Sequence, residues 1–403
     1  MTAFSRPLAI LRDLIAIPSV NPAYDPESAG ESLIATYISA WARSLGLDVQ
    51  RQGVFPGRDN VLVRLAPEGT DAGNLPVLLL EAHMDTVSVD AMAEPFAPAI
   101  RDGRLYGRGA CDTKGSLAAM MAAIESLVDG RSDLPCVVEL LAAVDEETSG
   151  TGVRAHVGAG HRADGAIVGE PTGLRVIHAH NGCIRGEIVV TGRAAHTSVA
   201  SEGINAIEGM AEVIVALRDL NAELAGRAGG AAANGSLTVS LIHGGTGINI
   251  VPEQCVISYD RRTVPGDVAT DVLAEIDAAL NRVRSARPDL RIERRVPALI
   301  DNALDTGPDA GIVRVASAAN LSLGLDPAPT TVPYGSDASK LSVDGGIPAI
   351  VYGPGDIAQA HGAGEYVEIA QVEAAAAFYG AVALGFGRAD IVPGVVVSHS
   401  AEN

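Results

Sequence analysis

Three apolar runs, each followed by acids or a histidine, constrain the fold of this chain most strongly. The runs are residues 77–80, 137–144 (apolar except for Glu139) and 166–168, and the polar residues that follow are His83, Asp145 to Glu147, and Glu170. Short apolar runs of this kind are typical of strands buried on both faces of a mainly parallel sheet. In such sheets, ligands bind beyond the carboxyl ends of the strands. The sequence therefore predicts an α/β fold, with helices on both faces of a mostly parallel sheet and a ligand site at one edge.

Five short segments carry side chains that suit metal ions. They are HMDTV with His83 and Asp85, GRGACDTKG with Asp112, DEETSG with Glu146 and Glu147, GEPTG with Glu170, and HGAGEYV with His361. Zinc accepts imidazole nitrogen and carboxylate oxygen, and a pair of metal ions can share a carboxylate and hydrolyse substrates at neutral pH. Asp112 lies between Gly109 and Gly115, which let the backbone turn tightly enough to present its carboxylate to both ions. These segments together predict a two-metal hydrolase.

Each segment taken alone has a simpler explanation. His83 could be a hydrogen-bonded core histidine, and residues 145–147 could be a solvated strand end. Glu170 precedes Pro171, and the residue before a proline favours extended backbone, so this pair could be only a turn. Five such segments, most of them following predicted strands, favour a metal site over five unrelated features.

The five motifs occur in an order that resembles the di-zinc amidohydrolase and metallopeptidase family. That family contains acetylornithine deacetylase, succinyl-diaminopimelate desuccinylase, aminoacylase-1 and carboxypeptidase G. The flanking segments IAIPSVNP and GAGEYVEIAQ are similar to the family as well, so the resemblance covers essentially the whole chain.

The resemblance implies a role for each candidate residue. One metal ion would be held by His83 and Glu170, the other by Glu147 and His361, with Asp112 bridging the two. Asp85 would hydrogen-bond the His83 imidazole and fix its tautomer, as partners of metal-bound histidines usually do. Glu146 would be the general base. The cofactor implied is a pair of divalent ions, Zn²⁺ first, with Co²⁺ or Mn²⁺ as alternatives.

The reaction implied by the resemblance is hydrolysis of the amide bond of a small N-acyl amino acid. A water activated by the metal ions would attack the carbonyl, and Glu146 would pass its proton to the leaving amine. GRLYGRGACDTKGSLAAMMAAI and DRRTVPGD are most similar to acetylornithine deacetylase and its desuccinylase relatives. A dipeptidase or carboxypeptidase-type exopeptidase is the alternative. A metal-binding relative without catalytic activity is a third, against which the intact Glu146 argues.

A chain of 403 residues exceeds the usual size of a single core, so more than one domain is expected. The pattern changes over residues 176–297, where a strand pair (176–180 and 186–190) leads to helix, strand, strand, helix and strand. This order predicts an inserted α+β domain of the ferredoxin-like, split βαβ type. We expect a catalytic domain in two parts, residues 1–175 and 298–388, an insert at 176–297 and a tail at 389–403.

Three residues of the insert are implicated by the same resemblance. His196 in GRAAHTS would reach the active site of a partner subunit and stabilise the developing oxyanion, so the insert would act as a lid and dimerisation domain. Asn249 in GGTGIN would contact substrate. Arg262 in DRRTVPG would bind a substrate carboxylate, which the donor fork of a guanidinium matches. The simpler alternatives are a turn histidine, a hairpin glycine cluster and a surface arginine.

Composition limits which partners the protein can bind and which cell compartment is expected. The formal net charge of -20 argues against nucleic-acid binding. No apolar stretch is long enough to span a membrane, and Arg12 and Asp13 interrupt the N-terminal apolar run, which lacks a signal-peptide layout. The four cysteines are widely spaced without a CxxC pair and are expected to be reduced. We expect a cytoplasmic homodimer that acts on a small N-acyl amino acid or short peptide, without nucleic-acid or membrane partners.

Overall fold

The computed structural model describes residues 4–68, 72–89, 92–227 and 234–388. The chain divides into two compact units. Unit 1 comprises Met1–His178, Thr306–Thr330 and Ser336–Asn403, and unit 2 comprises Ala179–Asp305 and Thr331–Gly335. The tail predicted at 389–403 lies outside the described residues. Within the described part of the chain, no helix combines the length and apolar composition needed to cross a membrane.

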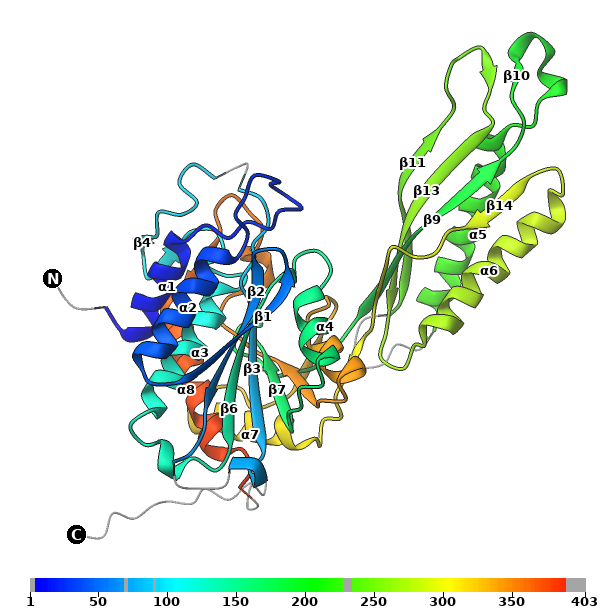
Figure 1. Cartoon of the computed structure of the whole chain (residues 1–403). Coiled ribbons are helices and arrows are strands. Elements are labelled where there is room, and N and C mark those ends of the chain that lie inside the picture. The colour runs from blue at the N-terminus through cyan, green and yellow to red at the C-terminus, as the bar shows by residue number, and fades with distance from the viewer. Residues whose placement is uncertain (1–3, 69–71, 90–91, 228–233, 389–403) are drawn as a thin grey trace, which may run out of the picture. The chain divides into compact units, whose positions relative to one another are not determined.

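Unit 1 begins with two helices and a run of strands, after which helices and strands alternate over residues 114–168 (Figure 1). Its main helices are α1 (Arg6–Ala16), α2 (Ser32–Ser44), α3 (Lys114–Leu127), α4 (Thr151–Gly158), α7 (Gly311–Ser322) and α8 (Ile369–Gly385). The strands of the large sheet are β1 (Asp48–Phe55), β2 (Arg58–Leu65), β3 (Val77–His83), β6 (Val137–Ala143), β7 (Gly165–Val168), β8 (Ile177–His180), β16 (Leu304–Asp305), β17 (Thr330–Val332) and β18 (Ala349–Val351). Most of this sheet belongs to unit 1, whereas β16 and the ends of β8 and β17 belong to unit 2.

The large sheet is parallel at its centre and antiparallel at its flanks. Its order is β1-β2-β6-β3-β7-β18-β8-β16, with β17 paired to β8. The neighbours β6, β3, β7 and β18 run parallel to one another. The three apolar runs of the sequence form β6, β3 and β7, which are almost completely buried. The predicted α/β class and mainly parallel sheet are therefore confirmed.

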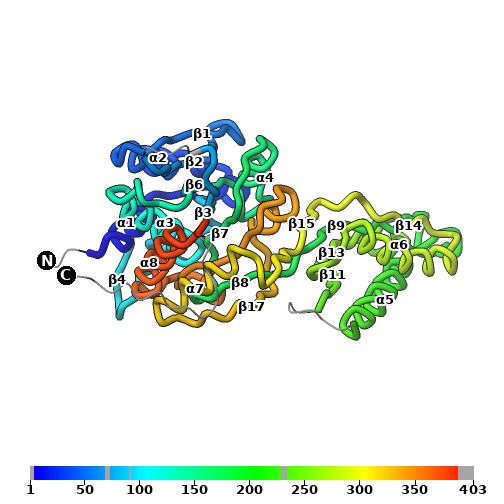
Figure 2. The backbone as a smooth tube through the Cα atoms, turned by 90° about the horizontal axis from the view of Figure 1, so that it is seen from below, coloured from blue at the N-terminus to red at the C-terminus, as the bar shows by residue number. Residues whose placement is uncertain are grey.

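Helices cover both faces of this sheet, as predicted. One face carries Leu78, Leu80 and Ala82, which share a hydrophobic core with α1, α2, α3, α7 and α8. Figure 2 shows α3 and α8 side by side on that face. On β1, neighbouring side chains point to opposite faces. Arg51 therefore reaches α2, whereas Gln52 Nε2 donates to the backbone oxygen of Ala155 in α4 (3.0 Å).

A second, smaller sheet in unit 1 joins residues far apart in the sequence. It has the order β19-β5-β4, formed by β19 (Tyr366–Glu368), β5 (Arg104–Tyr106) and β4 (Ala99–Arg101). Tyr366 pairs with Tyr106. This pairing places the loop that contains His361, which precedes β19, beside the loop that contains Asp112, which follows β5.

Unit 2 has the predicted split βαβ pattern. Its elements are β9 (Gly182–Thr191), β10 (Ala195–His196), α5 (Ala206–Ala225), β11 (Ser236–Gly244), β12 (Ile250–Val251), β13 (Gln254–Thr263), α6 (Ala269–Ala286), β14 (Arg291–Arg294) and β15 (Leu299–Asp301). The main sheet has the order β11-β13-β9-β14, with β15 also on β9. Residues of α5 and α6, such as Met210 and Leu280, share a core with Ile188 and Ile257 of the sheet.

One predicted pairing is wrong. We expected the strands at 176–180 and 186–190 to pair, but β8 belongs to the large sheet and β9 to the sheet of unit 2. Both edges of β9 are already occupied, by β13 on one side and by β14 and β15 on the other. Gly182 begins β9 so close to the Asp301 backbone oxygen that a Cβ would lie 2.3 Å from it. The chain therefore passes from one sheet to the other at this glycine.

Candidate metal centre

Most of the candidate ligands follow three neighbouring parallel strands. β3 lies between β6 and β7 in the sheet, with His83 opposite Ala143 and Glu81 opposite Val168. His83 is the last residue of β3, Glu146 and Glu147 follow β6, and Glu170 follows β7. Because parallel strands end at the same edge of a sheet, this register brings the three segments together.

A backbone turn directs both glutamates that follow β6 toward this edge. Consecutive side chains of an extended strand point to opposite faces. The backbone is no longer extended at Asp145, whose φ of 71° lies in the left-handed region that residues other than glycine seldom adopt. As a result, a carboxylate oxygen of Glu146 and one of Glu147 each lie within 4.8 Å of a ring nitrogen of His83.

The carboxylate of Asp112 lies between the two candidate histidines. Its Oδ1 is 3.0 Å from His83 Nε2 and its Oδ2 is 3.1 Å from His361 Nε2. Asp112 is buried, just before the first turn of α3, where the helix dipole favours an anion. Each oxygen of this carboxylate thus faces a different imidazole.

Each histidine also has an acid of its own. Glu170 Oε1 lies 3.8 Å from His83 Nε2, and Glu147 Oε2 lies 3.3 Å from His361 Nε2. The side chain of His361 is 51% exposed, whereas that of His83 is only 1% exposed. The centre therefore consists of two halves that share Asp112, one of them open to solvent.

The donor set fits a pair of divalent cations. Imidazole nitrogen and carboxylate oxygen are the ligands that zinc and related ions accept. Among the described residues, the buried Oε1 of Glu147 has no hydrogen-bond partner, which is costly for a carboxylate unless a cation binds it. The structure thus offers suitable donors for two ions and one donor oxygen that needs a partner.

The electrostatics of the acids point the same way. Burial raises the pKa of Glu146 and of Glu170 well above its usual range. Burial, and next the charge of Asp112, raises the pKa of Glu147. Burial alone would raise the pKa of Asp112 too, but hydrogen bonds with the two histidines hold it well below its usual range. A bound divalent ion would be the largest charge here and would stabilise the ionised form of every acid.

Asp85 supports the centre through its backbone and its side chain. Its backbone oxygen lies 3.0 Å from His83 Nδ1, and its Oδ1 lies 3.6 Å from the same nitrogen. A carbonyl oxygen only accepts hydrogen bonds, so Nδ1 carries the hydrogen and Nε2 is free to bind a metal. The carboxylate also accepts the backbone N–H groups of Glu146 (3.1 Å) and Glu147 (3.2 Å). Asp85 thus holds one candidate ligand and the backbone of two further acids.

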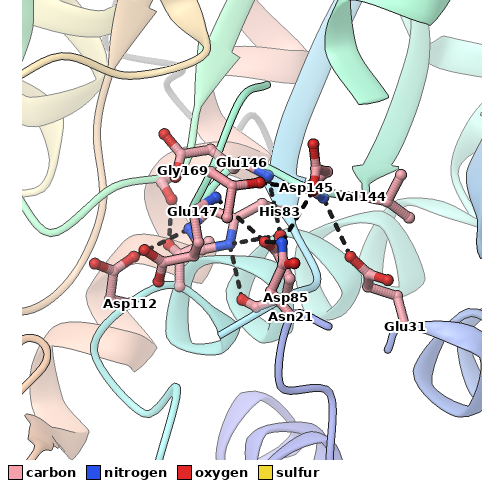
Figure 3. A network of polar contacts seen from close by, with 12 residues as sticks. Asn21, Glu31, His83, Asp85, Asp112, Val144, Asp145, Glu146, Glu147 and Gly169 are labelled. Carbon is pink, nitrogen blue, oxygen red and sulfur yellow. Dashed lines mark hydrogen bonds and ion pairs between the residues drawn. The ribbon is translucent and has the colours of Figure 1, made fainter. Parts of the chain in front are cut away.

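A buried network behind Asp85 was not predicted from the sequence (Figure 3). Asn21 Nδ2 donates to Asp85 Oδ2 (2.7 Å) and to Asp145 Oδ1 (3.1 Å). Glu31 accepts the backbone N–H of Asp145 (3.1 Å) and is paired with Arg58 (2.7 Å). Asn21 belongs to the IAIPSVNP segment, which the resemblance had marked without giving it a role. Glu31 and Arg58 carry no local pattern that separates them from a surface ion pair.

The other three predicted residues lie in unit 2. His196 of β10 pairs with Ile250 of β12, and the backbone oxygen of Asn249 accepts the N–H of Thr197 (3.0 Å), so His196 and Asn249 are exposed neighbours. Arg262 lies near the end of β13 and forms an ion pair with Asp260 (2.8 Å).

Comparison with known sequences identifies similar proteins. Residues 79–385 match the family described as peptidase family M20/M25/M40. The acetylornithine deacetylase of Salmonella paratyphi B is 32% identical over 369 residues, which cover 90% of this chain and 92% of that protein.

Solved structures share the fold over nearly the whole chain. A tripeptidase from Staphylococcus aureus superposes with a TM-score of 0.75 at 19% identity and covers 94% of this chain and 96% of its own. A dinuclear metal-binding peptidase of the M20 family from Bacillus subtilis superposes with a TM-score of 0.72 at 17% identity, with coverage of 94% and 97%.

Proposed function

Because this chain belongs to the peptidase family M20/M25/M40, we propose that it hydrolyses the amide bond of a small N-acyl amino acid. Metal-dependent amide hydrolysis is the reaction class of this chain. The observation that carries the proposal is the carboxylate of Asp112, which lies between His83 and His361, each with a further acid beside it.

We assign the ligands by their distances. His83 and Glu170 would hold one ion, His361 and Glu147 the other, and Asp112 would contact both. Zn²⁺ is our first choice because two imidazoles and three carboxylates suit it, and Co²⁺ or Mn²⁺ would accept the same donors. Two bound ions would polarise the substrate carbonyl and lower the pKa of water.

Glu146 is our candidate for the general base. One of its carboxylate oxygens lies within 4.8 Å of ligand atoms of His83 and Glu170, close enough to serve a substrate held at that ion. The raised pKa of Glu146 suits a group that takes a proton and then gives it to the leaving amine. The same position would let Glu146 bind an ion directly. The number of metal ions bound by Glu146→Gln distinguishes a base from a ligand.

The roles of His196, Asn249 and Arg262 stay proposals, and their placement within unit 2 supports a dimer. His196 comes after the C-terminal end of β9, whereas Arg262 pairs with Cys183 near the N-terminal end of the same strand. Thr191 lies eight positions after Cys183, which is about 27 Å along a strand. A small substrate cannot touch both side chains of one copy, so we propose that a second copy supplies His196 to the site that uses Arg262.

The edge of the unit 2 sheet is our proposed contact between the two copies. β11 pairs only with β13 among the described strands, and its apolar residues Leu241 and Ile242 are more than half exposed. Exposed apolar edge strands pair readily with another chain. The same strand on a second copy, related by a two-fold axis, would cover both edges.

Cytoplasmic location is also a proposal, and the cysteines support it. All four are buried and free: Cys111, Cys136, Cys183 and Cys255. Disulfides are rare where thiols are kept reduced, so free cysteines suit a reducing compartment.

Exopeptidase activity is the second candidate, because a tripeptidase is among the proteins with this fold. The test is a panel of N-acetyl, N-succinyl and N-formyl amino acids and dipeptides, given to purified protein loaded with Zn²⁺. Release of acetate from N-acetylornithine without action on dipeptides would support the deacylase. Cleavage of dipeptides alone would replace it with the exopeptidase, and no turnover on any substrate would leave a metal-binding relative without activity.

A further inference from the structure

We propose that Glu365 is a positioning residue that sets the geometry of the ion site formed by His361. The proposal deepens the two-metal function proposed above and rests on it. Glu365 lies four residues after His361 and touches none of the candidate ligand side chains in the contacts described for it. Its effect would be exerted through the backbone of the loop that carries Asp112.

The carboxylate of Glu365 is surrounded by donors from one loop. Its Oε1 accepts the backbone N–H groups of Cys111 (2.9 Å) and Asp112 (3.1 Å). Its Oε2 accepts the N–H of Gly109 (3.1 Å) and a guanidinium hydrogen of Arg108 (2.6 Å). Glu365 is only 1% exposed and Arg108 only 3%. A buried charge held by four donors fixes the path of the loop as far as Asp112 itself.

The loop also has backbone contacts of its own, from the Arg108 N–H to the Pro95 oxygen (2.8 Å) and from the Ala110 N–H to the Gly107 oxygen (3.1 Å). It runs from Gly107 to Asp112, and Gly109 has φ 81°, a conformation that suits glycine. A Cβ on Gly109 would meet Thr86 and Lys114 at 3.0 Å, so larger side chains have no room. A loop packed this closely leaves its buried N–H groups dependent on an acceptor from elsewhere. Glu365 is that acceptor for three of them.

The small sheet of unit 1 explains why Glu365 reaches this loop. β5 ends at Tyr106, immediately before Gly107, and β19 begins at Tyr366, immediately after Glu365. Tyr106 and Tyr366 are paired, and the N–H of Gly107 donates to the backbone oxygen of Glu365 (3.2 Å). The two ligand loops therefore leave neighbouring strand ends, and Glu365 joins them at the point where they separate.

The two ion sites should not depend equally on this contact. His83 is the last residue of β3, Glu170 lies two residues beyond β7, and Asp85 accepts the backbone N–H of Glu147, so these three ligands have backbone supports other than Glu365. His361 lies on an exposed loop in the left-handed region, with φ 60°. The distance between His361 and its shared ligand depends on both loops that Glu365 joins. Loss of the contact should therefore weaken the site of His361 more than the site of His83.

A purely structural ion pair would give a different result. It would lower the free energy of unfolding but leave the ratio of the two metal affinities unchanged. The experiment that separates the two roles is calorimetric titration of metal-free full-length protein with Zn²⁺, in parallel with thermal unfolding. The test variant is Glu365→Gln, which keeps the size of the side chain. The matched control is Glu368→Gln, which breaks the half-buried pair with Arg104 (2.8 Å) three residues further along.

We expect Glu365→Gln to raise the dissociation constant of the more weakly held Zn²⁺ by about 10- to 100-fold, the range for partners of metal ligands. The other dissociation constant should change at least several-fold less, and saturating Zn²⁺ should restore turnover. Glu368→Gln should leave both constants at the wild-type values. Equal weakening of both sites, or no weakening of either, overturns the proposal. If Glu365→Gln does not fold, Arg108→Gln must show the same unequal weakening or the proposal fails.

The same titration distinguishes failure of the positioning role from failure of the two-metal function. Wild-type protein should bind two Zn²⁺ ions, and His361→Ala should lose the weaker one. A wild type that binds fewer than two ions overturns the two-metal function, and the positioning role with it. Two ions in the wild type, together with unchanged affinities in Glu365→Gln, overturn the positioning role alone.

Discussion

Replacing Asn21 by alanine should reduce both the stability and the turnover of this protein. The Asn21 amide donates to two buried carboxylates, those of Asp85 (2.7 Å) and Asp145 (3.1 Å). Asp85 in turn holds the backbone N–H groups of Glu146 and Glu147. The substitution therefore removes no ligand, yet it loosens the turn that presents two acids to the metal centre.

The loss in the free energy of unfolding depends on the hydrogen bonds that Asp85 and Asp145 keep in the variant. A hydrogen bond to a charged group contributes about 1.5–3 kcal/mol, so two would contribute roughly 3–6 kcal/mol. Asp85 keeps two backbone donors, and Asp145 keeps the hydroxyl group of Thr148 and an ion pair with Arg58. We therefore expect a loss of roughly 2–4 kcal/mol in the free energy of unfolding. Domains have about 5–15 kcal/mol in total, so the variant should still fold.

The assay is urea unfolding of metal-free protein, since bound metal would add to the stability, followed by measurement of kcat with metal restored. Asn205→Ala is the control, because Asn205 caps α5 in unit 2 through its side-chain oxygen. Asn205→Ala should lose about 1 kcal/mol in the free energy of unfolding and keep the wild-type kcat. A loss below 1 kcal/mol in Asn21→Ala, with kcat unchanged, would refute the reasoning.

Three further predictions concern the base, pH and assembly. Glu146→Gln should keep two Zn²⁺ ions by metal analysis and lose about 10²- to 10⁴-fold in kcat; loss of an ion instead would make Glu146 a ligand. Burial, and next the charge of His161, lowers the pKa of His156 to about 4, against about 6.5 in an unfolded chain. Below pH 6.5 only the unfolded state gains this proton, so the free energy of unfolding should fall by about 3 kcal/mol between pH 6.5 and 4. In urea unfolding, His156→Gln should show a pH-dependent fall that is smaller than that of the wild type by about this amount, and an equal fall in both proteins would count against the prediction. Lysine at both Leu241 and Ile242 should convert the dimer to monomer in sedimentation equilibrium, and a dimer that persists would exclude β11 as the contact.

Three central strands of the large sheet, β3, β6 and β7, could be predicted because each is a short apolar run followed by polar residues. Residues 137–143 are apolar except for Glu139 and form a strand buried along its whole length. The pairing of β8 could not be predicted in the same way. Residues 177–180 are short and equally compatible with either sheet, and the strands that occupy both edges of β9 come from distant parts of the sequence.

The candidate ligands could be found from the sequence because each lies in a short motif, whereas their supports could not. Asn21 reaches Asp145 across 124 residues, and Glu365 reaches Asp112 across 253. An acid or an amide in an exposed loop has the same local sequence as one that holds an active-site backbone. Burial and partners distinguish them, and both depend on the folded chain.

The number of Zn²⁺ ions bound per chain tests the central claim most directly. Metal analysis after equilibrium dialysis should be carried out on wild-type protein, on Asp112→Asn and on Asp129→Asn, an exposed acid beyond the other end of α3. We predict two ions in the wild type and in Asp129→Asn, and fewer than two in Asp112→Asn, because the carboxylate of Asp112 faces both histidines. Fewer than two ions in the wild type, or two ions held with unchanged affinity by Asp112→Asn, would contradict a two-metal centre built around this carboxylate.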